Sequence, residues 1–202
     1  ALNAIVSVPN STGVTSVDKT GSGMWMLTGT SSYSGQLRVL DGTLVVGANV
    51  SSQANSASPF GITNGALAAV YPLVGGTAAS LSGTAALLLA DGVSVGRDFT
   101  VAGPGAGSSQ AVVLGGLGSG TSSFSNSGGA IYLGRAVTLQ AGTGGFVTFA
   151  NAWALSGTTG PTITFGSPGN AGMVMVNKGL PTSSPVLVNL GTARMGGSEI
   201  ID

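Results

Sequence analysis

The chain has 202 residues with 36 Gly, no His and no Cys, and its six basic residues balance its six acidic ones. Charged residues make up 6% of the sequence, against roughly a quarter in ordinary soluble domains, so no basic surface for nucleic acid is expected. The apolar content of 43% argues against a disordered chain, and Gly, Ser, Thr, Asn and Pro interrupt the apolar runs too often for a membrane span.

The expected elements are short β-strands. Glu, Lys and Arg are scarce and the apolar residues show no helical period, whereas alternations of about three to six residues are bounded by Gly or Asp-Gly. These alternations predict strands, in chain order, at residues 24–27, 36–40, 43–46, 93–95, 98–102, 131–133, 136–140, 145–150, 162–165, 173–176 and 185–190. The sequence therefore predicts an all-β fold.

An internal similarity indicates how these strands are arranged. Residues 93–103 align with residues 131–141, which sets Arg97 against Arg135. We interpret the offset between the two segments as two coils of a stacked solenoid, which predicts roughly ten coils of about 19–20 residues with parallel strands. An antiparallel barrel or sandwich is the alternative, because Asp-Gly pairs such as 91–92 could form hairpin turns.

A segment near the N-terminus carries a family signature. Residues 17–47 contain Lys19-Thr20-Gly21, Trp25, Tyr33-Ser34-Gly35 and Gly42-Thr43-Leu44 in this order. With this pattern the segment resembles one copy of the autotransporter-associated β-strand repeat. The resemblance implies a right-handed parallel β-helix displayed outside the cell, in secreted passengers of bacterial adhesins or in phage fibres. It implies no catalytic residues.

Residue roles follow from the resemblance and from the internal similarity. Glycines supply the positive φ that tight corners require, and alternate apolar residues face inward. The expected turn formers are Gly21, Gly23, Gly29, Gly35, Gly42, Gly96 and Gly134. The expected core residues are Trp25, Leu27, Val39, Leu44, Val95, Val101, Leu133 and Leu139. We expect residues 1–16 to form an N-terminal capping or docking segment, residues 17–190 the solenoid, and residues 191–202 a C-terminal cap or tail.

Catalytic chemistry has little support in the sequence. Without His and Cys, Ser-His-Asp triads, Cys-His nucleophiles and ordinary zinc sites are excluded, and no cofactor or metal is expected. Asp91 or Asp98, near Arg97 and Arg135, is the one grouping that could serve a polysaccharide-degrading β-helix. We favour the interpretation that Asp91-Gly92 is a turn and that Arg97 and Asp98 are solvated surface charges.

Binding surfaces are a further alternative. Aromatic side chains emerging on one face could stack on carbohydrate, although scattered aromatics or core positions are the more ordinary arrangement. The aromatic candidates are Trp25, Tyr33, Tyr71, Tyr132 and Trp153. The Thr-x-Thr triplet at 162–164 is typical of ice-binding faces, but a single triplet cannot form a regular lattice.

The function expected from the sequence is structural. We expect a non-enzymatic solenoid of an exposed fibre or surface-decorating assembly, on a bacterial surface or a phage virion, acting in attachment and assembly. The expected partners are further copies of the chain or other subunits, which would contact loop tips at residues 51–64 and 119–129. The alternatives are an autotransporter passenger fragment that binds glycans or a host surface, and a polysaccharide-degrading enzyme.

Overall fold

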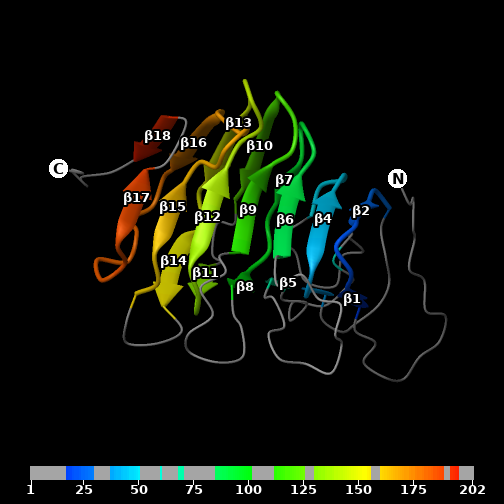
Figure 1. The fold of residues 1–202 in the computed structure, drawn as a ribbon, viewed down its shortest axis with the longest axis horizontal. Coiled ribbons are helices and arrows are strands. Elements are labelled where there is room, and N and C mark those ends of the chain that lie inside the picture. Colours follow the sequence, from blue (N-terminus) through cyan, green and yellow to red (C-terminus); the bar gives the residue numbers. More distant parts are fainter. Residues whose placement is uncertain are drawn as a thin grey trace.

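The computed structural model describes residues 17–29, 37–50, 60, 68–70, 85–101, 112–125, 130–155, 160–188 and 192–195. Within these ranges every regular element is a β-strand, and none is a helix of the length and apolar character needed to cross a membrane. Figure 1 shows the strands standing side by side along the long axis of the molecule. The all-β prediction is therefore confirmed.

The strands form three sheets. The six-stranded sheet contains β1 (Val17–Lys19), β3 (Leu37–Val39), β5 (Ala68–Val70), β8 (Phe99–Val101), β11 (Ala130–Leu133) and β14 (Ala152–Leu155). The seven-stranded sheet contains β2 (Met24–Leu27), β4 (Gly42–Val46), β6 (Ala85–Leu89), β9 (Val112–Gly116), β12 (Val137–Gln140), β15 (Ile163–Phe165) and β17 (Val186–Val188). The five-stranded sheet contains β7 (Ser94–Val95), β10 (Thr121–Phe124), β13 (Phe146–Phe149), β16 (Met173–Val176) and β18 (Thr192–Met195).

From β6 to β16 the chain visits the three sheets in a fixed cycle, whereas β1 to β6 alternate between the six-stranded and seven-stranded sheets. From β8 in the six-stranded sheet it passes to β9 in the seven-stranded sheet and then to β10 in the five-stranded sheet, and β11 to β13 repeat the cycle. The strands of one cycle pair in parallel with those of the next. All strand pairs of the described residues are parallel, so the antiparallel barrel or sandwich is excluded for them. Parallel strands stacked in this way are the arrangement of a β-solenoid.

The core is a set of apolar rows that run from coil to coil. In the seven-stranded sheet one inward row pairs Leu44, Leu87, Leu114, Leu139 and Phe165, all buried. Parallel in-register pairing places one member of the row directly above the next, at the strand spacing of about 4.8 Å. The row is therefore continuous along the stack, so each coil covers the apolar surface of its neighbour.

The aromatic part of the core lies behind the five-stranded sheet. Phe124 and Phe149 are paired residues of β10 and β13, and both are fully buried. Their rings are stacked with centroids 4.8 Å apart and planes 5° apart. Trp153 approaches Phe149 at 5.8 Å between centroids. The stacking distance equals the strand spacing, which indicates that coil spacing and ring packing reinforce each other.

The coils differ in length. Trp25 pairs with Leu44, which matches the predicted coil length, but Leu44 pairs with Leu87, more than twice as far along the chain. The offset between Arg97 and Arg135 is also not two coils. The sequence alignment set Val101 against Leu139, but Val101 pairs with Leu133, and these two residues lie in adjacent coils. The prediction of a uniform coil length is therefore wrong for the described strands, since the connections between strands vary in length.

Several segments differ from the sequence prediction, which missed the strands β1, β5, β6, β9 and β14. Residues 119–129 were expected to form a loop tip, but β10 occupies residues 121–124 and Phe124 is fully buried. The segment 191–202, predicted to be a C-terminal cap or tail, contains β18, which pairs in parallel with β16. The N-terminal segment 1–16 and most of the loop tip at 51–64 lie outside the described residues.

Candidate functional site

The first coils contain a buried lysine at a corner of the stack. Lys19 ends β1 and is fully buried. Its ammonium group donates hydrogen bonds to the carbonyl oxygens of Thr20 at 3.0 Å, Asp41 at 2.9 Å and Gly21. The nitrogen also lies 5.4 Å from the ring centroid of Trp25. Three carbonyl acceptors use all three N–H groups of the ammonium, so this side chain ties the corner after β1 to the corner after β3.

Trp25 occupies an inward position without being buried. It pairs with Leu44 and so begins the inward row of the seven-stranded sheet. The ring is nevertheless 37% exposed, because β2 is the outermost described strand and has a neighbour on one side only. The prediction of Trp25 as a core residue is therefore wrong in burial, although the face of the strand was predicted correctly. The ring instead covers the ammonium group of Lys19 from one side.

The remaining predicted core positions are inside the stack. The buried residues among them are Leu27, Val39, Leu44, Val95, Val101, Leu133 and Leu139. The predicted turn glycines differ from one another. Gly21 and Gly42 have positive φ, at 74° and 67°. Gly23, Gly29, Gly96 and Gly134 lie between strands without a positive φ, so the conformational reason given for them is wrong, and Gly35 lies outside the described residues.

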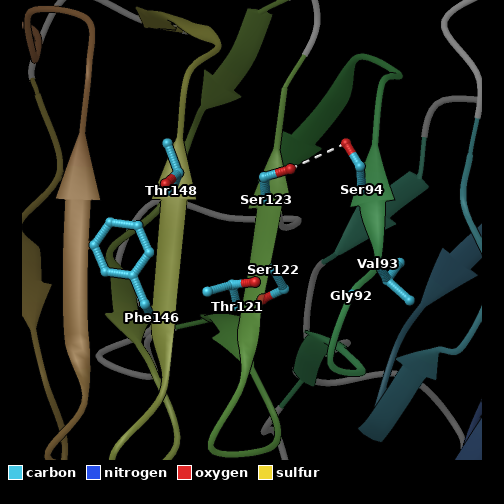
Figure 2. Close-up of a pocket in the computed structure, with 8 residues that line it drawn as sticks. All are labelled: Gly92, Val93, Ser94, Thr121, Ser122, Ser123, Phe146 and Thr148. Carbon is cyan, nitrogen blue, oxygen red and sulfur yellow. Dashed lines mark hydrogen bonds between the residues drawn. The ribbon is translucent and has the colours of Figure 1, made fainter.

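A shallow groove lies on the outer face of the five-stranded sheet. It has a volume of about 230 Å³ and is lined by residues from β7, β10 and β13 and from the turn before β7. The lining residues are Gly92, Val93, Ser94, Thr121, Ser122, Ser123, Phe146 and Thr148, and Figure 2 shows them across the three strands. None of these residues carries a charge. Residues 121–123 were expected in a loop tip, and no sequence pattern connected them with Ser94 or Thr148.

Serine hydroxyls from neighbouring coils are linked in this groove. Ser123 Oγ donates to Ser94 Oγ at 3.0 Å, and Ser94 Oγ lies 2.9 Å from Ser125 Oγ. Figure 2 shows the Ser94 and Ser123 side chains turned toward each other between β7 and β10. The backbone N–H of Ser94 donates to Asn49 Oδ1 at 2.8 Å, which joins the preceding coil to the same row. The hydroxyls are therefore held in place before any ligand arrives.

One comparison with known proteins bears on the first coils. The family model described as the passenger-associated-transport-repeat covers the strands β1 to β4. Residues 17–46 match this repeat. The resemblance drawn from the sequence is thus confirmed, and we call residues 17–46 the transport repeat. No curated protein and no solved structure matches the chain.

The transport repeat includes the whole lysine corner. Lys19, Trp25 and Asp41 all lie within it, as do the two glycines with positive φ at the same corner. The repeat type is associated with autotransporter passengers, so the match indicates a passenger-type region and a secreted or surface-exposed protein. The transport repeat lies at the start of the described stack. Its last strand, β4, pairs with β6, so the sheet continues from the repeat into the later coils.

The residues proposed for polysaccharide cleavage are not brought together. Arg97 lies between the five-stranded and six-stranded sheets, whereas Arg135 lies between the six-stranded and seven-stranded sheets, and both are buried. Asp91 packs against Gly118 and Gly120 of the next coil, while Asp98 accepts a hydrogen bond from the Ala130 N–H at 3.1 Å. Arg97 and Arg135 do not share a face, because the similar sequences occupy different corners of the coil. The expectation that Arg97 is a solvated surface charge is also wrong, because its side chain is buried.

In the described part of the chain, neither metal-ligating residues nor the aromatic candidates Tyr132 and Trp153 gather into one site. Within it, no group of three or more His, Cys, Asp or Glu could hold a metal ion. Tyr132 is 38% exposed on the outer face of the six-stranded sheet, whereas Trp153 pairs with the buried Ile131 and packs against the core. Tyr132 and Trp153 therefore point to opposite sides of that sheet and cannot form one platform. Tyr33 and Tyr71 lie outside the described residues.

The lysine corner gives a first testable prediction. Burial lowers the pKa of Lys19 below 10.5, and the charge of Asp41 partly opposes this. Replacing Lys19 by Met leaves three carbonyls without their donor, and we expect the free energy of unfolding to fall by about 1–3 kcal/mol. Urea titrations of both proteins at neutral pH measure this difference.

The pH dependence of the same variant has a definite sign. Because the pKa is lower in the folded chain, the unfolded chain binds more protons between the folded value and 10.5, and stability rises with pH in that window. We therefore expect the difference between the native chain and Lys19→Met to widen as the pH approaches 10.5. A difference that narrows instead would show that the pKa of Lys19 is higher in the folded chain than in the unfolded chain.

Proposed function

We propose that this chain is a non-enzymatic structural part of an exposed passenger, a right-handed parallel β-helix that acts in attachment and assembly at a bacterial surface. The observation that carries the proposal is the continuous parallel register that runs from the transport repeat through the later coils. Continuous ladders and a continuous core give a stiff, protease-resistant support, and outer faces and loops remain available for contacts.

The separate positions of Asp91 and Asp98 in the described part of the chain support the structural role over polysaccharide cleavage. Glycoside hydrolysis requires two carboxyl groups about 5 to 9 Å apart across one bond. Among the described residues, Asp91 lies at the turn between β6 and β7, whereas Asp98 lies before β8 and is engaged by the Ala130 N–H. An assay on polysaccharides is expected to detect no turnover. Turnover that Asp91→Asn or Asp98→Asn abolishes would contradict the non-enzymatic role.

Exposed apolar residues at both ends of one sheet support assembly. The outward row of the seven-stranded sheet begins with Met24, which is 55% exposed, and reaches Leu187, which is 54% exposed. Between them the row passes through smaller residues such as Thr43 and Thr164. End-to-end stacking of two copies would place Met24 beside Leu187 and remove both from water, which is favourable by about 25 cal/mol per Å² of apolar surface.

Native mass and shape test the assembly role. We expect light scattering and electron micrographs of the purified chain to show a closed oligomer or an end-to-end filament. Leu187→Glu should shift the population toward the monomer, because it places a charge in the proposed contact. The control is Leu117→Glu, since Leu117 is also exposed, at 37%, but lies in a connection between strands. A native chain that is a monomeric rod at all concentrations would contradict assembly.

A further inference from the structure

The groove on the five-stranded sheet has the chemistry of a ligand site. Its eight lining residues supply five hydroxyl groups, one aromatic ring, the apolar side chain of Val93 and the backbone of Gly92, and none is charged. The groove is open at the turn before β7, where nothing lies within 4 Å of the position of an added Cβ at Gly92. A ligand for such a surface must be uncharged and rich in hydrogen-bonding groups, because a charged ligand would lose its hydration without gaining an opposite charge.

The hydroxyl groups of the groove are spaced along the stacking axis. Ser94, Ser123 and Thr148 are partners in the parallel register of β7, β10 and β13. The row therefore repeats a hydroxyl at the strand spacing of about 4.8 Å. A hydroxyl can donate and accept, as can each hydroxyl of a sugar. Because Ser123 Oγ donates its proton to Ser94, its lone pairs are available to accept from a ligand.

An aromatic ring borders the hydroxyl row. Phe146 belongs to the second outward row of the sheet, where it pairs with Thr121, and it is half-buried. Phe146 and Thr148 come from the same strand and line the same groove in Figure 2. An apolar ring beside a row of hydroxyls matches a pyranose, which has an apolar C–H face and a hydroxylated edge.

We propose that this groove binds a neutral oligosaccharide, laid along the stacking axis with its hydroxyls on the Ser94–Ser123–Thr148 row and one sugar ring against Phe146. The successive strands offer an equivalent contact to each successive sugar unit, which favours a linear chain over a single sugar. The inference names a ligand class for the attachment role proposed above and rests on that role. The site lies on a different sheet from Met24 and Leu187, so the two proposals are tested separately.

Saturation-transfer NMR with three neutral linear trisaccharides tests the site. The probes are maltotriose, cellotriose and the trimer of N-acetylglucosamine, with trigalacturonate as the charged comparison. We expect at least one neutral trisaccharide to bind and trigalacturonate to bind more weakly. Phe146→Ala should weaken binding by about tenfold, the size expected for loss of one aromatic contact. Ser123→Ala should also weaken it, because it removes the central hydroxyl and adds no atoms to the groove.

The control is Tyr132→Ala, which removes an exposed aromatic from the six-stranded sheet and should leave binding unchanged. Circular dichroism establishes that each variant is folded. The proposal is overturned if no neutral trisaccharide binds, if trigalacturonate binds as well as they do, or if Tyr132→Ala weakens binding as much as Phe146→Ala. Failure of these assays with an intact oligomer leaves the assembly role standing, whereas a monomer that binds the trisaccharide contradicts assembly alone.

Discussion

Replacing Phe149 by Ala is expected to lower the free energy of unfolding by about 3–5 kcal/mol, the range for truncating a fully buried aromatic side chain. Phe149 is fully buried and its ring is stacked on Phe124 in the coil before it. It also contacts Trp153 at 5.8 Å between centroids. Removing the ring leaves a cavity between two coils that short strands cannot close without losing register. Chemical unfolding followed by circular dichroism measures the effect.

Phe146→Ala is the control for this prediction. Phe146 lies at the start of the same strand, and because side chains alternate across a strand it faces outward. The same chemical change at Phe146 is expected to lower the unfolding free energy by about 1 kcal/mol or less, since this ring lies on the outer face and is only half-buried. Equal losses for the two variants would contradict the assignment of the inner and outer faces of β13.

The strands with regular apolar alternation could be predicted from the sequence. Residues 173–176 and 146–149 are strands as predicted, because Val174, Val176 and Phe149 supply a clear inward period. β10 was missed because its sequence, Thr-Ser-Ser-Phe, looks like a polar loop. Only Phe124 signals the core, while Ser122 occupies an inward position and is buried. A strand whose stability comes mainly from its two neighbours carries little local signal.

The arrangement of the coils was harder to predict than the strands. The similarity between residues 93–103 and 131–141 is real, but each segment is a strand, a Gly-Arg corner and a strand, and such a unit occurs at different corners of one coil. Sequence similarity alone therefore does not tell at which corner of the coil each segment lies.

The groove could not be predicted for a related reason. Ser94, Ser123 and Thr148 become neighbours only through the register of three coils, and the lengths of the connections determine that register.

Gly42→Ala is expected to lower the free energy of unfolding by at least about 3 kcal/mol, because backbone strain and a steric clash act together. Gly42 has a φ of 67°, where a residue with a Cβ is strained by about 1–2 kcal/mol. An added Cβ would also lie 2.4 Å from the carbonyl oxygen of Gly21 and 2.6 Å from that of Gly23. Both contacts are with backbone, so the first two coils would have to separate at the lysine corner.

Gly21→Ala separates the two causes. Gly21 has a similar φ of 74°, but nothing lies within 4 Å of the position of an added Cβ. We therefore expect this variant to lose about 1–2 kcal/mol, from backbone strain alone. The difference between the variants in chemical unfolding measures how closely the start of β4 approaches the turn before β2 within the transport repeat. Equal losses would mean that the first two coils are less tightly stacked at the lysine corner than the structure shows.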